Sequence, residues 1–401
     1  MLIHQGSHLT YCTNIHAGES WEEVFNSIKK YILPIKQNIS SDKPFGIGLR
    51  LSDEASKTLI DPTTLQNFKW WLDQNELYVF TMNGFPFGGF HDTEVKDNVH
   101  KPDWTSQSRL AYTIRLCNIL AYLLPEGLDG GISTSPISYK PWFKNDNQRI
   151  HNTFKDACKN ILEVIQVLYL IKLETGKTIH IDIEPEPDGL IENTYETIHF
   201  FKQYLIPLGI TYFRNKHNIR ELKAEEIIKT HVQVCYDVCH FAIEYEEPKL
   251  VFEQLKKEGI KIGKIQISAA LKADLSKPRD LIAQQLSPFI ESTYLHQVIA
   301  RDANNALTHY TDLSLAMDNL SHTHDIEWRT HFHVPIFIAS FHLLESTQDE
   351  IVKVLNYQKE NSVTHHLEIE TYTWEVLPEE LKMPLLDSID RELKWVIAQF
   401  N

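Results

Sequence analysis

The amino-acid sequence predicts a single (β/α)8 barrel, the fold also known as a TIM barrel. The chain has 401 residues, which is long for one small domain but within the range of a barrel with insertions. Short runs rich in β-branched residues alternate with longer helical patterns from one end to the other. There are eight such runs, and the sequence closes on a helical pattern, as the last unit of a barrel requires.

The predicted strands lie at residues 8–15, 45–52, 77–84, 129–136, 178–185, 231–238, 261–268 and 364–371. Helical patterns lie at residues 20–35, 103–124, 149–176, 246–259 and 378–400. The first begins with Ser20 and Glu23, whose spacing is that of a capping box. An open doubly wound sheet is the alternative. It is weakened because no strand is followed by a Gly-x-Gly-x-x-Gly turn.

The seventh and eighth predicted strands are separated by residues 269–363, far more than an ordinary connection. This segment contains a predicted hairpin at residues 296–313 and a further β-rich run at 328–337. No linker rich in Pro, Gly or Ser bounds it. We therefore interpret residues 269–335 as an extended βα loop of a single domain that spans residues 1–401.

Composition restricts the class of partner. Lys and Arg number 39 against 54 Asp and Glu, a formal net charge of -15, so nucleic acid is not an expected partner. The densest basic stretch, residues 256–264, reads as a solvated helix end. The first residues lack a signal-peptide pattern, and the longest apolar stretch is broken by Glu163 and Gln166, so no membrane segment is expected. Five cysteines without a Cys-x-x-Cys pair indicate a reduced, cytoplasmic setting. Self-association into a homo-oligomer is left open.

The C-terminal ends of barrel strands face one cavity, and catalytic residues lie there. Clustered carboxylates at that cavity repel one another, and a divalent cation removes the cost. Glu, Asp, Gln or His, and Glu around an open position suit Mn²⁺, Mg²⁺, Co²⁺ or Zn²⁺. The polar residues at the predicted strand ends and in the long loop are Asn14, His16, Asn83, His91, Glu184, Glu186, Asp237, His240, Gln266, Ser268, His331, His333, Glu368 and Glu370. The pattern predicts one bound divalent metal ion, with Asp237 as a ligand and His240 as a ligand or its partner.

Each of these side chains also has an ordinary structural explanation. Asp237 could cap the helix that begins near Cys239, because a strand-end Asp is more often a helix cap than a ligand. His240 could be a hydrogen-bonded histidine. Glu186 and Glu368 could be solvated or packed against loop groups, and the two histidines of the His-x-His sequence could be exposed loop residues. The joint placement at successive strand ends favours the metal site over these separate explanations.

The order of these residues carries a resemblance. The sequence resembles the xylose isomerase-like barrel superfamily, which includes sugar epimerases and isomerases and endonuclease IV. The resemblance rests on a Glu at the fifth strand end followed in order by VCYDVCH, KIQIS, H-x-H and LEIET. The whole chain more specifically looks like the EboE-type metabolite traffic family, on stretches such as LTYCTNIHAGESWEEV, MNGFPFGGFH, IDIEPEPDG and LEIETYTW. The superfamily resemblance implies a metal ligand set of Glu184, Asp237, Gln266 and Glu370. Gln266 departs from relatives that place a His there.

Three functions remain open. The first is a metal-dependent isomerase or epimerase acting on a sugar, cyclitol or related polyol, in which Glu184 and Glu370 exchange a proton with the substrate. Its expected substrate-binding residues are His16, His91, His240, His331, His333 and Trp374. The second is a phosphoester hydrolase in which extra histidine ligands hold a second metal. The third is a metabolite-binding protein without catalytic activity.

Overall fold

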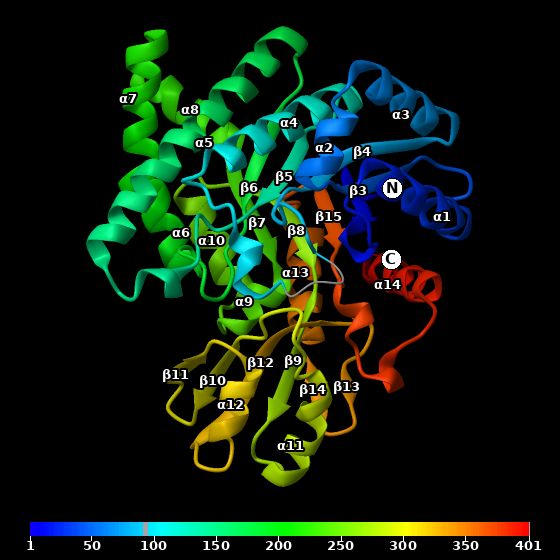
Figure 1. Ribbon diagram of the computed structural model, residues 1–401, viewed down its shortest axis with the longest axis vertical. Helices are drawn as coiled ribbons and strands as arrows, with labels where there is room; N and C mark the ends of the chain where they lie inside the picture. The colour runs from blue at the N-terminus through cyan, green and yellow to red at the C-terminus, as the bar shows by residue number, and fades with distance from the viewer. Residues whose placement is uncertain (91–94, 401) are drawn as a thin grey trace.

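The computed structural model describes residues 1–90 and 95–400. Within these residues, eight parallel strands form a closed barrel with helices packed around it (Figure 1). The barrel strands are β2 (Ser7–Tyr11), β3 (Phe45–Arg50), β4 (Leu77–Asn83), β5 (Gly130–Thr134), β6 (Ile179–Ile183), β7 (Val232–Asp237), β8 (Ile262–Ile267) and β15 (His366–Ile369). All eight predicted strands are confirmed, and so is the barrel.

Neighbouring strands follow the order β2-β15-β8-β7-β6-β5-β4-β3, and the barrel closes between β3 and β2. A parallel bridge joins Cys12 to Gly48 at this seam. Thr10 Oγ1 donates to the Gly46 carbonyl at 2.8 Å and accepts from the Gly48 N–H at 3.1 Å. A side chain at Gly48 would overlap Oε1 of Glu368, so glycine is required for the strands to meet here. The short strand β1 (Leu2–His4) pairs antiparallel with β2.

The helices of the described chain are α1 (Trp21–Ile39), α2 (Asp53–Leu59), α3 (Pro62–Gln74), α4 (Gln107–Leu123), α5 (Asn147–Thr175), α6 (Thr194–Phe200), α7 (Ile206–His217), α8 (Glu221–His231), α9 (Val238–Ile243), α10 (Pro248–Lys257), α11 (Arg279–Leu286), α12 (Leu313–Asn319), α13 (Gln348–Asn361) and α14 (Leu385–Phe400). The predicted capping box at α1 is present, since the Glu23 N–H donates to Ser20 Oγ and the Glu23 carboxylate accepts from the Ser20 N–H. The helices that lie wholly or almost wholly outside the predicted elements are α2, α3, α6, α7, α8, α9, α11, α12 and α13. Over the described residues, none of the helices combines the length and the apolar character needed to cross a bilayer.

The long segment between β8 and α13 forms a second sheet, which lies below the barrel in Figure 1. Its strands in the described chain are β9 (Ala269–Asp274), β10 (Val298–Asp302), β11 (Leu307–Tyr310), β12 (Asp325–Val334), β13 (Ser340–Phe341) and β14 (Leu344–Ser346), in the order β11-β10-β12-β9-β14-β13. We refer to residues 269–346 as the inserted sheet. The predicted hairpin is its β10–β11 pair. Only Ser268 separates β8 from β9, so the inserted sheet continues directly from a barrel strand.

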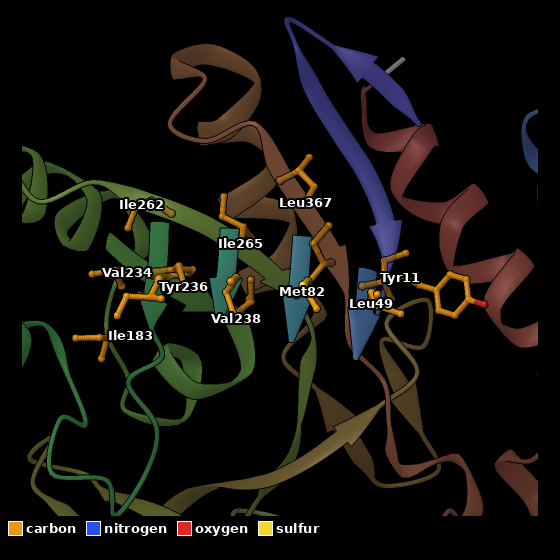
Figure 2. Close-up of a cluster of buried hydrophobic side chains, with 14 of the residues drawn as sticks. Tyr11, Leu49, Met82, Ile183, Val234, Tyr236, Val238, Ile262, Ile265 and Leu367 are labelled. Atoms are coloured by element: carbon orange, nitrogen blue, oxygen red, sulfur yellow. The ribbon is translucent and has the colours of Figure 1, made fainter. Parts of the chain in front are cut away.

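Side chains alternate along each barrel strand between the helix layer and the lumen. Those that face the helices are apolar, and Figure 2 shows Tyr11, Leu49, Met82, Ile265 and Leu367 in this buried layer. The intervening positions supply polar or small residues to the lumen, which distinguishes this barrel from the usual lumen of large branched side chains. The apolar core therefore lies mainly between the strands and the helices.

A buried ion pair lies inside the lumen, between the neighbouring strands β8 and β15. Lys264 Nζ on β8 lies 2.7 Å from Glu368 Oε2 on β15, and both side chains are fully buried. The same ammonium donates to the Met82 carbonyl on β4 at 3.0 Å and to Ser133 Oγ on β5 at 3.4 Å. Burial lowers the pKa of Lys264, but the Glu368 carboxylate outweighs burial and raises that pKa overall. The interpretations of Lys264 as part of a solvated helix end and of Glu368 as solvated are both wrong, because both side chains point into the lumen.

A buried carboxyl on α14 gives a testable dependence of stability on pH. Glu392 Oε1 accepts hydrogen bonds from Thr371 Oγ1 at 2.8 Å and from the Ile336 N–H at 3.2 Å, and burial raises its pKa from 4.5 to about 8. The pKa of Glu392 is thus higher in the folded chain than in the unfolded chain. The neutral carboxyl contributes stability at low pH, and this contribution is lost as pH rises from 4.5 to about 8.

We expect Glu392→Gln to raise the free energy of unfolding at pH 9 by on the order of 2–4 kcal/mol, and to raise it much less at pH 5. Urea denaturation of both proteins at the two pH values measures this difference. The exposed Glu379→Gln is the matched control and is expected to change neither value. An equal effect of Glu392→Gln at pH 5 and pH 9 would contradict the assignment.

Candidate metal and substrate site

The C-terminal ends of the barrel strands meet at a cavity that faces the inserted sheet. Strand residues Asn83, Glu184 and Glu370 line it on the barrel side. Gln297 and His331 line it from the inserted sheet. Two parts of the chain that are far apart in sequence therefore build one site, at the end of the barrel where catalytic residues are expected.

Asp237 is both a helix cap and a potential metal ligand. It ends β7, and its Oδ1 accepts the N–H of His240 at 3.2 Å, which caps α9. Ser268 Oγ donates to the same oxygen at 2.6 Å. Burial opposes ionisation of Asp237, but the His240 and His333 rings and these hydrogen bonds outweigh it and lower its pKa. Oδ2 has no hydrogen-bond partner among the described residues, so the cap leaves one oxygen for a ligand.

Glu184 and Glu370 lie on either side of Asp237. One carboxylate oxygen from each of the three residues lies within 4.8 Å of the others. Burial, followed by repulsion from Asp237 and the neighbouring glutamates, raises the pKa of Glu184 well above its usual value. Burial, followed by repulsion from Glu184 and Asp237, does the same for Glu370. Such a cluster is costly for the protein alone and is stabilised by a divalent cation.

The two glutamates differ in how they are held. Glu370 Oε1 accepts hydrogen bonds from Asn14 Nδ2 at 2.8 Å and from Asn83 Nδ2 at 2.9 Å, so two amides fix its orientation. Oε2 of Glu184 has no hydrogen-bond partner in the described part of the chain, although Glu184 is only 3% exposed. A buried carboxylate oxygen without a donor needs a cation or a substrate proton to compensate it.

Gln266 lies next to Asp237, in register with it on the adjacent strand β8. Its amide oxygen accepts from Cys235 Sγ at 2.9 Å, and its amide nitrogen has no partner among the described residues. With the amide turned by half a rotation, the nitrogen would donate to Cys235 and the oxygen would take the place of the unpartnered nitrogen. The donors Glu184, Asp237, Glu370 and Gln266 thus fit a hard divalent cation.

The site extends toward the inserted sheet through three buried histidines, His240, His331 and His333. His333 Nδ1 donates to the Glu370 carbonyl at 2.8 Å, so Nε2 carries a lone pair, and that atom has no partner in the described structure. Burial lowers the pKa of His333 to about 4, which keeps this ring neutral. Metal-ligating atoms of Asp237, His240 and His333 lie within 4.8 Å of one another.

The His240 and His331 rings contact each other through Nε2 atoms 3.1 Å apart. His240 Nδ1 lies 3.0 Å from the Pro185 carbonyl, which can only accept. Gln297 donates its amide N–H to the Pro187 carbonyl at 3.2 Å, so its oxygen accepts from His331 Nδ1 at 2.9 Å. Both Nδ1 atoms therefore carry protons, and the two Nε2 atoms face each other across one shared proton or one metal ion. Burial, followed by the neighbouring imidazoles, lowers the pKa of His331 well below its usual value.

Two predicted substrate-binding residues lie away from this cavity. His16 is buried beside Tyr11, whose hydroxyl lies 2.9 Å from Nε2, and it stacks on the Tyr31 ring at a centroid distance of 4.2 Å. The 3-10 turn at Thr13–Ile15 directs it toward α1. Trp374 is buried after β15, and Tyr372 occupies the cavity wall in its place. The prediction for His91 concerns a residue outside the described ones.

The structure adds a carboxylate–imidazole pair that the strand-end pattern does not predict. His100 Nε2 lies 2.9 Å from Glu186 Oε1, both residues are buried, and both line the cavity. Of the two structural explanations of Glu186, solvation is wrong and packing against a loop group is confirmed, because His100 belongs to the connection between β4 and α4. His100 ends a 3-10 turn between β4 and α4, so no strand end marks it. Phe90, Tyr294 and Tyr372 pack together to form an aromatic wall beside the pair.

Comparisons with known proteins concern the whole chain. A scan against models of protein families finds no match, and a search of curated protein sequences finds none. Among solved structures, the chain is similar to a D-tagatose 3-epimerase-like protein, with a TM-score of 0.50, 12% identity and 98% of each chain covered. It is also similar to a xylose isomerase-like TIM barrel protein from Mycobacterium smegmatis in complex with magnesium, with a TM-score of 0.51, 9% identity, and 100% of this chain and 98% of that chain covered. At these identities the likeness concerns the fold alone, which is a TIM barrel.

Proposed function

We propose that the protein is a divalent-metal-dependent isomerase or epimerase that acts on a small sugar, cyclitol or related polyol. The observation that carries this proposal is the group of three buried carboxylates, Glu184, Asp237 and Glu370, with two raised pKa values at the cavity of a TIM barrel. The epimerase-like and magnesium-bound neighbours of the fold support the same class. The likeness to EboE-type metabolite traffic proteins agrees with a small-metabolite substrate and names no reaction.

The ion would be held by Glu184, Asp237, Gln266 and Glu370. When bound, a divalent cation polarises a substrate carbonyl and acidifies the adjacent C–H. Glu184, whose Oε2 has no donor among the residues that the structure describes, would remove the proton from that carbon. Glu370, which Asn14 and Asn83 hold in place, would return a proton from the other side. The aromatic wall of Phe90, Tyr294 and Tyr372 would cover an apolar sugar face and exclude water.

The surrounding polar groups would orient the hydroxyl groups. His240, His331 and the His100–Glu186 pair offer donors and acceptors along one side of the cavity. His333 would act nearer the ion, since its free Nε2 is grouped with Asp237 and His240. These positions fit a substrate with several adjacent hydroxyl groups, because each group finds a rigid, buried partner.

Solvent deuterium exchange tests the proposal. The metal-loaded protein is incubated in D₂O with a panel of ketoses, aldoses and inosose-type cyclitols. We expect deuterium at the carbon beside the carbonyl of at least one substrate, with loss of more than about 100-fold in Glu184→Gln, since general acid–base groups contribute 10²–10⁴-fold. Glu244→Gln changes another buried carboxyl, outside the cavity, and is expected to retain exchange. Metal loading without exchange on any member of the panel would contradict the proposal.

A second candidate function rests on the facing Nε2 atoms of His240 and His331. Ligating atoms of Cys239, His331 and His333 also lie within 4.8 Å of one another, so a second ion could be held beside the first. Two adjacent ions favour phosphoester hydrolysis. Two or more zinc ions per chain at the cavity, together with release of p-nitrophenol from bis(p-nitrophenyl) phosphate, would favour this function over isomerisation.

A further inference from the structure

A second group of metal-ligating side chains lies at the opposite end of the barrel. Asp129 directly precedes β5, His180 is on β6, and His366 is on β15, at the N-terminal ends of these strands. One ligand atom from each lies within 4.8 Å of the other two. Two barrel strands, β7 and β8, separate β6 from β15, so the group reaches across the lumen (Figure 1). Exposed His365 lies beside it.

His180 and His366 lie farther from the Asp129 carboxylate than good hydrogen bonds require, at distances that a bound ion can bridge. His180 Nε2 lies 3.8 Å from Asp129 Oδ2, and His366 Nε2 lies 3.5 Å from Asp129 Oδ1. His365 Nδ1 lies 3.4 Å from Asp129 Oδ1. Good N–H···O hydrogen bonds span 2.7–3.2 Å. In a tetrahedral zinc site with bonds of 2.0–2.1 Å, adjacent ligand atoms are about 3.4 Å apart.

His180 is oriented as a metal ligand usually is. Its Nδ1 lies 2.6 Å from Asp182 Oδ1, which fixes the ring and directs Nε2 toward Asp129. Metal-ligating histidines generally donate their other ring N–H to such a carboxylate. His180 is 1% exposed, and its Nε2 makes no hydrogen bond within the described residues. A side chain at Gly263 would overlap Asp182, so the lumen provides room for this second carboxylate.

We propose that Asp129, His180 and His366, with His365 as the fourth ligand, bind one zinc ion that stabilises the N-terminal end of the barrel. The ligand set of one carboxylate and three imidazoles suits zinc in tetrahedral geometry. With all four positions taken by protein, the site leaves no open position for a substrate. In TIM barrels generally, the N-terminal end of the strands serves stability and the C-terminal end serves catalysis. The ion would bind β6 to β15, two strands that do not pair with each other.

A network without metal is the competing arrangement. His366 Nε2 also lies 3.2 Å from the Asp129 carbonyl, to which a protonated nitrogen would donate. Burial lowers the pKa of His180, but Asp182 and Asp129 outweigh it and raise that pKa to about 9, so a charged ring can balance the two carboxylates. The two arrangements differ in whether the protein retains a transition-metal ion at this end.

Metal binding is measured in a chain whose cavity ligands are removed by Glu184→Gln, Asp237→Asn, Glu370→Gln, His331→Asn and His333→Asn, so that the result does not depend on either candidate function of the cavity. After dialysis against Zn²⁺ or Co²⁺, we expect one ion per chain and, with Co²⁺, intense visible absorption typical of tetrahedral coordination. Adding His180→Asn or His366→Asn should abolish binding. Asp182→Asn should weaken it about 10–100-fold, as loss of a carboxylate partner does.

Two further variants keep the test decisive if a lumen substitution prevents folding. His365→Ala removes the exposed ligand and is expected to weaken Zn²⁺ binding and abolish the tetrahedral Co²⁺ spectrum in a folded chain. His322→Asn, at an exposed position of the inserted sheet, is the matched control and should change neither. The proposal would be overturned if the chain without cavity ligands bound no Zn²⁺. It would also be overturned if His365→Ala and a folded His366→Asn both bound Zn²⁺ as tightly as their parent chain.

Discussion

Replacing Lys264 with methionine is expected to lower the free energy of unfolding by about 3–5 kcal/mol. The substitution leaves the Glu368 carboxylate fully buried in the lumen without its ammonium partner. It also leaves the Met82 carbonyl and Ser133 Oγ without this donor. Removal of one partner of a buried pair is costly because the remaining charge stays desolvated. Urea denaturation followed by circular dichroism measures the change.

The double variant Lys264→Met with Glu368→Leu provides the control. It removes both charges and keeps similar side-chain volumes, so most of the lost stability should return. A double variant as unstable as Lys264→Met would show that the lumen cannot pack apolar side chains. A single variant of unchanged stability would contradict the fully buried pair.

Asp237→Asn is expected to lower kcat/KM for the proposed reaction by about 1,000-fold or more, with loss of the bound ion at the cavity. The carboxylate is central to the ligand group, and metal-based stabilisation of developing charge is worth several kcal/mol. Asn can still accept the hydrogen bond that caps α9, so the helix should remain formed. Elemental analysis and steady-state kinetics on the exchanged substrate measure the two effects.

Asp146→Asn is the matched control, because Asp146 caps α5 in the same way at an exposed position. It should retain both metal and activity. Retention of the cavity ion by Asp237→Asn would exclude Asp237 as a ligand. Loss of the ion with full activity would separate the metal from the reaction.

The barrel strands could be predicted because each is a short β-rich run whose length and flanking residues are distinctive. Asp237, Glu184 and Glu370 could be predicted as a group because each is a carboxylate at the end of such a run. The helix-cap interpretation of Asp237 is confirmed, since one oxygen caps α9, and its role as a metal ligand stays a prediction. The metal and the role of each residue stay predictions.

Other features depend on contacts that no local pattern encodes. Lys264 resembles a surface lysine in sequence, and only the pairing of β8 with β15, two strands far apart in the chain, places Glu368 beside it. His100 lies in a connection, and its pairing with Glu186 depends on how that connection folds over the cavity. His16 follows a predicted strand end, but a 3-10 turn directs it toward Tyr31. Helices α2 and α3 are separated by the Asp61–Pro62 turn, which divides the helical periodicity into short pieces.

The Lys264 ammonium has a consequence for the order in which the chain can fold. Its partners lie on β4, β5 and β15, and β15 is the last barrel strand to be synthesised. Until Glu368 arrives, a nascent barrel of seven strands would enclose an uncompensated positive charge. We therefore expect the barrel to close in one cooperative step after β15 has left the ribosome, with the earlier strands awaiting it in a loosely associated state.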